Sequence, residues 1–205
     1  MVQAGVNVLN LSVFIILFSE MTPSTNRVLA IIPVQTDYWE LSFDVIVEQD
    51  FPFWTNILQL TTAEAGWLTI GFRIPAFYVI GRSLGIRFSS EANSDVAGGA
   101  YLSLNQKHKI KIWQCGDMYN QNKLRKLVFL DGQLVMDSEH GTFATPFHNV
   151  KFFLGDKLYP PAPVRVSNLV YTPDLLYTGT VDLIFLFVGF LRDHKCVAFK
   201  STVYQ

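Results

Sequence analysis

Acidic side chains at regular spacing are the first residues of this sequence that could do chemistry. Glu40, Asp44 and Glu48 fall on one side of an alternating segment, four residues apart. Hydrolysis of a glycosidic bond needs two carboxyl groups that face each other, about 5 to 5.5 Å apart in retaining enzymes. Such a pair is expected from carboxylates two residues apart on a strand, whereas these are four residues apart. We therefore interpret these carboxylates as the solvated face of a strand.

The sequence offers no other catalytic arrangement that we can assign. It contains no H-E-x-x-H, P-loop or G-x-G-x-x-G motif. The histidines are scattered, at His108, His140, His148 and His194. Because His108 lies on the apolar side of its strand, we expect a core histidine there. From these observations we expect a chain that is not an enzyme.

The two cysteines, Cys115 and Cys196, lack the spacing of a metal site. They are also too few for a disulfide scaffold. A single bridge between them is one alternative, and two unpaired thiols are the other. We expect the unpaired thiols, because the position of the segment around Cys196 does not follow from the sequence.

Binding chemistry is concentrated in a polar excursion at residues 115–123. Sugar sites combine an aromatic platform with Asn, Asp or backbone donors, and loops commonly supply them. This excursion provides the candidate ligand-binding residues Asp117, Tyr119, Asn120 and Asn122. The alternative is that the segment is an ordinary hydrophilic connection.

A second polar loop, residues 89–99, contains the only candidate metal ligands, Asn93 and Asp95. Calcium takes six to eight oxygen ligands, which these two side chains cannot supply alone. We therefore expect no cofactor, with Ca²⁺ as the one ion to consider. Trp54 follows Phe51-Pro52-Phe53 and is expected either in an exposed aromatic patch or as a cap on the core.

The elements that position these residues are β-strands, because apolar residues recur with a period of two. Residues 38–48 are the clearest case. One face of this segment carries Trp39, Leu41, Phe43, Val45 and Val47. A shift of the strand pairing by one residue would expose all five side chains to water, so we expect the register of this strand to be well defined.

Residues 124–136 predict a β-hairpin around which the rest of the chain is organised. Asp131-Gly132 separates two apolar runs, and this dipeptide readily supplies the positive φ angles of a two-residue turn. The first arm is apolar on both faces. A second layer must therefore cover one of them, which indicates a sandwich.

Short strands follow one another along the rest of the chain, separated by turn residues. We expect them at residues 28–32, 56–61, 67–74, 84–88, 100–104, 107–114, 149–154 and 164–171. Residues 28–32 precede Pro33 and are typical of an edge strand. Lys107, Lys109 and Lys111 alternate along another strand and are expected on a solvated face. The fold class is all-β, an antiparallel two-sheet jelly-roll sandwich.

Chain length and charge limit the domain organisation and the kinds of partner that we expect. The 205 residues suit one domain with a sizeable core. The 16 basic and 17 acidic residues create no basic field. We therefore expect no nucleic-acid partner.

Apolar runs lie near both ends of the chain. Residues 8–18 have the length of a signal-peptide core and are too short to span a bilayer. We expect residues 1–24 to be a signal peptide and the protein to be secreted, the alternative being an extra apolar strand. Residues 25–173 form the expected domain. Residues 174–205 are a tail of uncertain structure, and we expect no transmembrane segment.

Several segments, taken in order, resemble the concanavalin A-like lectin/glucanase superfamily, of the laminin G or pentraxin type. The opening is carried by Trp-Glu-Leu-Ser-Phe-Asp at 39–44, Asn-Ile-Leu-Gln-Leu at 56–60 and Arg-Ile-Pro-Ala at 73–76. The later strands are carried by segments 108–114, 127–132, 150–156 and 164–171. The likeness covers residues 27–172 and implies a two-sheet jelly roll.

The resemblance implies an extracellular module that binds glycans, matrix proteins or cell-surface proteins without catalysis. The alternative is a structural or self-associating domain without a small ligand. A relative of the glycan hydrolases is a weaker alternative, because that branch of the superfamily uses two carboxylates that project from one strand, in the pattern E-x-D-x-x-E or with one spacer fewer. Neither Glu48 with Asp50 nor Asp137 with Glu139 completes this pattern.

Overall fold

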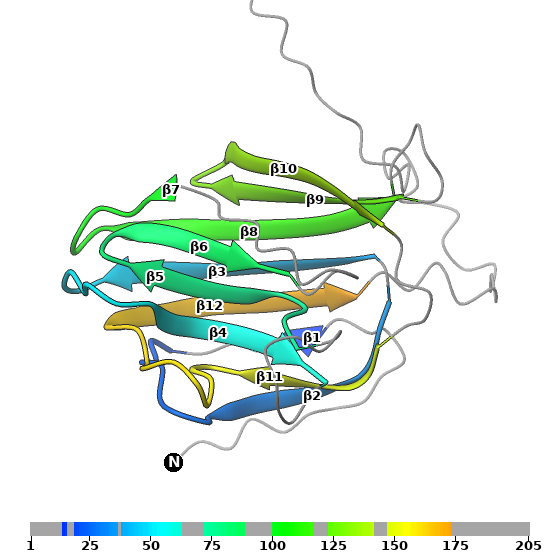
Figure 1. The fold of residues 1–205 in the computed structure, drawn as a ribbon, viewed down its shortest axis with the longest axis horizontal. Coiled ribbons are helices and arrows are strands. Elements are labelled where there is room, and N and C mark those ends of the chain that lie inside the picture. Colours follow the sequence, from blue (N-terminus) through cyan, green and yellow to red (C-terminus); the bar gives the residue numbers. More distant parts are fainter. Residues whose placement is uncertain are drawn as a thin grey trace, which may run out of the picture.

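The computed structural model describes residues 14–15, 19–36, 38–62, 72–88, 100–116, 123–141 and 147–173. Their regular secondary structure consists of β-strands, arranged in two stacked antiparallel sheets (Figure 1). This is the antiparallel jelly-roll sandwich that the sequence predicts. The described residues include no apolar helix of membrane-spanning length.

Each sheet has six strands. Sheet A has the order β1-β12-β3-β8-β9-β10, with bounds Phe14–Ile15, Val164–Pro173, Trp39–Val47, Lys107–Gly116, Lys123–Leu130 and Gln133–Gly141. Sheet B has the order β2-β11-β4-β5-β6-β7, with bounds Val28–Gln35, Phe147–Phe153, Thr55–Thr61, Ala76–Ile80, Ser83–Arg87 and Ala100–Tyr101. As predicted, β2 is an edge strand, although it continues through Pro33.

Strand β3 confirms the predicted alternation. Every second residue from Trp39 to Val47 is buried, and the residues between them are partly exposed. Partners across β3 and β8 are oppositely charged, with Lys111 Nζ 2.9 Å from Glu40 and Lys107 Nζ 3.9 Å from Asp44. The lysine row and the β3 carboxylates therefore form a solvated, ion-paired face, as expected.

The hairpin of β9 and β10 is also confirmed. Asp131 and Gly132 adopt φ angles of 51° and 83°, and Leu130 pairs with Gln133 directly beside them. The preceding strand β8 pairs with β9 along its length, so the hairpin completes one side of sheet A. Positive φ at both turn positions suits the right-handed twist of the flanking strands.

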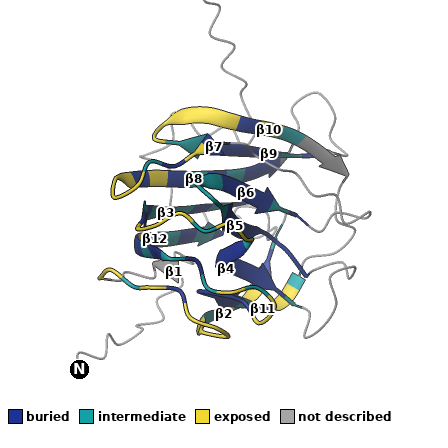
Figure 2. Ribbon diagram, turned by 60° about the vertical axis from the view of Figure 1, so that its left-hand side comes forward, coloured by how far each residue is buried: buried dark blue, intermediate teal, exposed yellow. Residues whose placement is uncertain are grey.

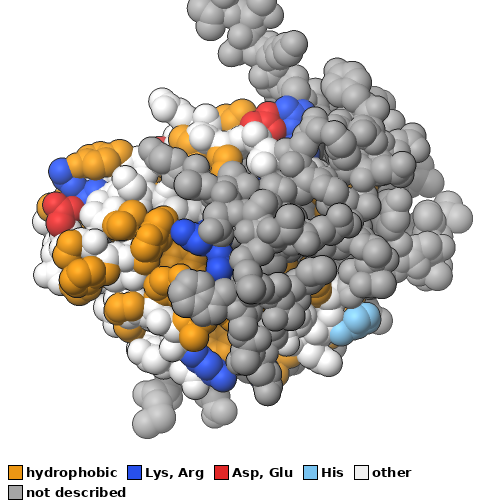
Figure 3. Space-filling model, viewed as in Figure 1, with side chains coloured by type: hydrophobic (Ala, Val, Ile, Leu, Met, Phe, Trp, Pro, Cys, Tyr) orange, Lys and Arg blue, Asp and Glu red, His pale blue; other side chains and the backbone are white. Residues whose placement is uncertain are grey.

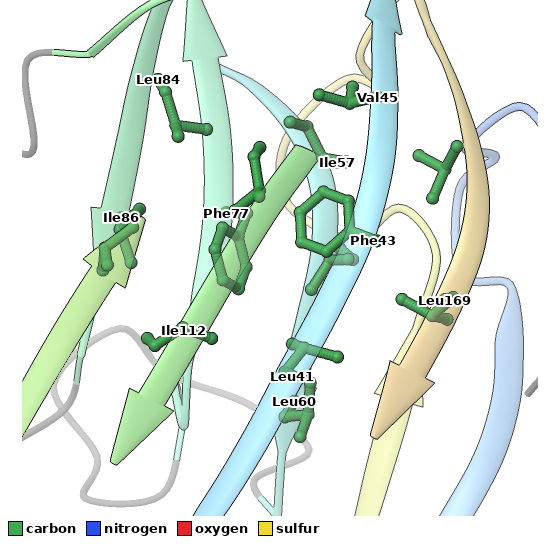
Figure 4. Packing of buried hydrophobic residues seen from close by; sticks show 14 of the residues in the cluster. Leu41, Phe43, Val45, Ile57, Leu60, Phe77, Leu84, Ile86, Ile112 and Leu169 are labelled. Atoms are coloured by element: carbon green, nitrogen blue, oxygen red, sulfur yellow. The ribbon is translucent and has the colours of Figure 1, made fainter. Parts of the chain in front are cut away.

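The core lies between the sheets and is wholly apolar at its centre. Leu41 and Phe43 point from β3 towards Leu60 and Phe77 on sheet B (Figure 4). The rings of Phe43 and Phe77 meet edge to face, with centroids 5.2 Å apart. In Figure 2 the centres of the strands are dark blue, whereas the first half of β10 and several turns are yellow. Burial of such side chains, about 1.5 to 3 kcal/mol each, holds the layers together.

The structure corrects the expected strand at residues 67–74. Of this range, residues 72–74 are described and are not in a strand; strand β5 instead begins at Ala76, after the cis bond to Pro75. The carbonyl of Phe72 accepts a hydrogen bond from Gln59 Nε2 at 2.5 Å, and that of Ile74 accepts one from Gln35 Nε2 at 2.8 Å. Buried amide side chains thus satisfy backbone groups that a sheet would otherwise pair.

The N-terminal segment adds a short edge to sheet A. Phe14 pairs with Tyr171, and Met21 exchanges two backbone hydrogen bonds of 2.8 Å with Val166. Arg165 also forms an ion pair of 2.7 Å with Glu20. Residues within the range that we assign to a signal peptide therefore contact β12. The predicted tail, residues 174–205, lies outside the described residues.

Cys115 is disulfide-bonded. The expectation of an unpaired thiol at this position is therefore wrong. Cys196, the second cysteine of the chain, lies outside the described residues.

Candidate functional site

The ligand-binding residues predicted from the sequence lie outside the described residues. This holds for Asp117, Tyr119, Asn120 and Asn122 and for the metal candidates Asn93 and Asp95. Within the described part of the chain, no group of three His, Cys, Asp or Glu side chains could hold a metal ion. These assignments therefore stay predictions.

A small pocket with both polar and apolar lining residues lies at the end of the sandwich from which both of those loops depart. Residues that line it include Phe88, just before one loop, and Gln114 and Lys126, on the strands that flank the other. Lys126 is fully buried, with its Nζ 4.3 Å from the centre of the Phe88 ring. Arg73 is equally buried and lines the same pocket. This end therefore combines positive charge with amides.

A second candidate site covers the outer face of sheet B. Leu84 and Ile86 of β6 point into the core, so Ser83, Gly85 and Arg87 point outward. The same alternation turns Tyr78 of β5 and Tyr101 of β7 to this face. We call the surface the aromatic–arginine face and define it by Trp54, Tyr78, Arg82, Arg87, Tyr101 and Tyr159. In Figure 3, hydrophobic and basic side chains lie together over β4, β5 and β6.

Trp54 lies across β6 at the centre of this face. A Cβ atom on Gly85 would come within 2.5 Å of the Trp54 ring, so only glycine leaves room for the indole. The Arg87 guanidinium carbon lies over the same ring, 4.7 Å from its centre. Tyr78 meets Trp54 edge to face, with centroids 6.1 Å apart. Since Trp54 and Arg87 are only half-buried, their exposed surfaces can contact a ligand.

Asp156 supports the face from below. Its Oδ1 accepts hydrogen bonds from the backbone N–H groups of Leu158 at 2.8 Å and Tyr159 at 2.7 Å. Its Oδ2 lies 3.5 Å from the hydroxyl of Tyr78. Tyr78 and Tyr159 in turn pack edge to face at 5.0 Å. Asp156 thus binds nearby backbone amides in a turn, and this turn positions the Tyr159 ring.

Burial shapes the electrostatics of this cluster. It raises the pKa of the Asp156 carboxyl above its usual value, although the backbone hydrogen bonds from Tyr159 and Leu158 oppose the shift. Burial also raises the pKa of Tyr78, and the nearby Asp156 charge adds to the rise. Tyr78 therefore carries its proton at neutral pH and acts as a hydrogen-bond donor.

Arg82 and Tyr101 extend the face to the other end of β6. The guanidinium carbon of Arg82 lies over the Tyr101 ring, 4.5 Å from its centre. Arg82 also pairs with Asp50, with Nε and Oδ1 3.2 Å apart. An arginine stacked on an aromatic ring thus lies just before β6, at Arg82, and another at its last residue, Arg87.

Two other features prove to be structural. His108 is a core histidine, as predicted: its Nδ1 lies 2.7 Å from Asp131 Oδ2, and its Nε2 accepts the backbone N–H of Ser103 at 2.9 Å. Gly81, Ser83 and Gly85 match the G-x-S-x-G spacing of a nucleophile elbow. They lie in the turn and the second strand of the β5–β6 hairpin, not in the strand-to-helix turn that the elbow requires.

Comparison with known proteins is possible at the level of structure. No protein-family model and no curated protein sequence matches the chain. A SAP-like pentraxin from Limulus polyphemus is 12% identical, with 74% of each chain covered and a TM-score of 0.49. The alginate lyase Aly36B is also 12% identical, with 70% of this chain and 72% of the lyase covered and a TM-score of 0.49. For a Trypanosoma rangeli sialidase the identity is 15% and the TM-score 0.49, and the chain spans about a fifth of that protein.

These comparisons correct the expectation that the chain is not an enzyme, because the sialidase and the lyase are enzymes. The expectation rested on the lack of paired carboxylates along one strand. Polar groups from distant segments nevertheless meet in this fold, as Tyr78 and Asp156 do at 3.5 Å. Proteins with this architecture include both binding modules and enzymes. The chain has the concanavalin A-like jelly-roll fold.

Proposed function

We propose that this chain binds glycans on the aromatic–arginine face of sheet B. The observation that carries the proposal is the half-buried Trp54 ring, which lies so close to Gly85 that it excludes any Cβ there and which has the Arg87 guanidinium over it. A sugar presents apolar C–H groups on the faces of its ring and hydroxyl groups around the edge. An aromatic platform beside a fixed donor matches both kinds of surface.

The arrangement beneath the platform supports the same proposal. A binding site needs a rigid base, and Tyr78, Asp156 and Asn56 supply one. Asn56 Oδ1 accepts the backbone N–H of Asp156 at 3.1 Å, and all three side chains are buried. Tyr159, held by this base, is the second partly exposed ring. We extend the proposal to an extracellular location, which the apolar residues 8–18 favour.

A glycan array probed with the full chain tests the proposal. Trp54→Ala should weaken binding at least about tenfold, or about 1.4 kcal/mol, because the central platform is lost. Phe53→Ala is the matched control, since Phe53 is an adjacent aromatic residue that is 61% exposed and outside the defined face. Circular dichroism and thermal unfolding establish that each variant is folded.

Gly85→Ala gives an independent test, because it keeps every ring and displaces only Trp54. We expect it to weaken glycan binding and to change the fluorescence of the protein. An array without any hit from a folded sample would refute the proposal, and so would equal losses in the Trp54 and Phe53 variants. The same incubations should be checked for shortened glycan products, which would add catalysis to binding.

A further inference from the structure

We propose that the ligand of the aromatic–arginine face is an anionic glycan chain, whose carboxylate or sulfate groups are bound by Arg87. This inference rests on the proposed glycan-binding function and specifies the substrate class. It follows from the distribution of charge between the two sheets and from the positions of Arg87 at the end of β6 and Arg82 just before that strand.

Charge divides the two sheets. The six strands of sheet B contain no Asp or Glu, and their only Lys or Arg residues are Lys151 and Arg87. Sheet A carries acids and bases together and pairs them, as Lys111 pairs with Glu40 and Arg165 with Glu48. A ligand with negative charge therefore meets no strand carboxylate on sheet B, whereas on sheet A it would face several.

Two described carboxylates, Asp156 and Asp50, lie at this face. Asp156 is only 2% exposed, and its Oδ1 is occupied by the backbone N–H groups of Leu158 and Tyr159. A ligand above the face cannot touch it. Asp50 is exposed, but it lies at the Arg82 end of the face, where its Oδ1 is 3.2 Å from the Arg82 Nε.

Arg87 has the geometry for an acidic group. Its guanidinium lies over the Trp54 ring and within 6.0 Å of the Tyr78 ring centre. Stacking uses the flat side of a guanidinium, while its five N–H donors lie in the plane and can engage a carboxylate or sulfate in addition to contacts within the protein. A sugar that contacts the exposed part of the Trp54 ring would place its acidic substituent beside these donors.

The length of the face favours a chain over a single sugar. Arg82 lies in the turn just before β6, and Arg87 is the last residue of that strand, so up to five residue steps of about 3.3 Å separate their backbones. Trp54 covers Gly85 between them. Arg82, stacked on Tyr101 and already paired with Asp50, would share its remaining donors with a second acidic group of the same ligand.

Calorimetry with two matched pairs of polymers tests this inference on the full chain. Polygalacturonate is compared with its methyl-esterified form, and heparin with desulfated heparin. We expect an acidic polymer to bind at least about tenfold more tightly than its neutral partner, and the difference to shrink as salt is added. The pair that responds identifies carboxylate or sulfate as the recognised group.

Substitution locates the effect. Arg87→Gln should remove most of the preference for the acidic polymer, and Arg87→Lys should keep part of it, because a lysine retains the charge without the planar donors. Lys109→Gln is the control, since it removes one exposed cation from sheet A. If Arg87→Gln does not fold, the salt dependence of the unmodified chain decides.

The outcomes separate the two proposals. Equal affinity for acidic and neutral polymers would overturn the anionic ligand and leave glycan binding intact. An equal loss in the Lys109 and Arg87 variants would also overturn it, because net charge alone would then explain the preference. Absence of binding to every glycan, neutral or acidic, would instead overturn the proposed function itself.

Discussion

Replacing Asp156 tests how the candidate site is supported. In Asp156→Ala the backbone N–H groups of Leu158 and Tyr159 lose the acceptor that they meet at 2.8 and 2.7 Å. Hydrogen bonds to a charged group contribute about 1.5 to 3 kcal/mol each, and neutral ones about 0.5 to 1.5. Leu158 is half-exposed, so water can replace part of the loss. We expect the free energy of unfolding to fall by about 2 to 4 kcal/mol.

Asp156→Asn is the informative companion. It keeps an oxygen at the same position and removes the buried charge, so we expect a change within about 1 kcal/mol at neutral pH. Burial raises the pKa of Asp156 in the folded chain. A raised pKa means that the folded state favours the protonated carboxyl. The resulting stability is fully present below the unfolded pKa, about 3.9, and is lost as the pH rises through the folded pKa.

Urea unfolding of the original chain and both variants, followed by circular dichroism from acid to neutral pH, measures these differences. The original chain should lose stability relative to Asp156→Asn as the pH rises from about 4, because asparagine does not titrate. Two results would refute the reasoning: an asparagine variant as unstable as the alanine variant, or a difference that moves in favour of the original chain with rising pH.

Three further substitutions or deletions have defined outcomes. Burial opposes ionisation of Asp131, but hydrogen bonds from His108 and a backbone N–H outweigh it and lower the pKa. The advantage of the original chain over Asp131→Asn in urea unfolding should therefore be present above about pH 3.9 and shrink as the pH falls further; a constant difference would contradict this. Tyr171 has a buried hydroxyl without a hydrogen-bond partner in the described structure. Tyr171→Phe should therefore leave the free energy of unfolding unchanged or raise it by up to about 1 kcal/mol. A clear decrease in that free energy would show that the hydroxyl does have a partner. A chain that begins at residue 25 lacks the hydrogen bonds between Met21 and Val166 and leaves β12 as an open edge. We expect this chain to have a lower melting temperature and to associate with increasing concentration in light scattering. If its melting temperature and its mass in solution are unchanged, the N-terminal edge contributes nothing to stability.

The sheets were predictable where local patterns determine structure. The alternation from Trp39 to Val47 leaves one register that buries the apolar face, and Asp131-Gly132 leaves one turn geometry. Strand β5 was missed because it follows Pro75 and has buried residues on both sides, including the outward-facing Tyr78. No period of two marks such a strand.

The candidate site was not predictable in the same way, because its contacts join segments far apart in sequence. Tyr78 and Asp156 are 78 residues apart, and the Trp54 ring meets Gly85 across two strands. These contacts depend on which strands are neighbours in sheet B. The alternation of apolar and polar residues predicts where a strand is, but not which strands lie beside it. The available signal was the glycine within β6, since a glycine in a strand often marks a close approach by another group.

The two sheets are held in register by different means, and this difference leaves one face available for binding. In sheet A, charged partners across β3 and β8 occupy the outer face. In sheet B, buried polar side chains do the corresponding work: Thr55 donates to the carbonyl of Val79 at 3.0 Å, and Asn56 donates to that of Phe77 at 3.3 Å. Because these bonds lie within the sheet and its core, the register of sheet B needs no charge on its surface. A cation there, such as Arg87, can therefore serve recognition without weakening the sandwich.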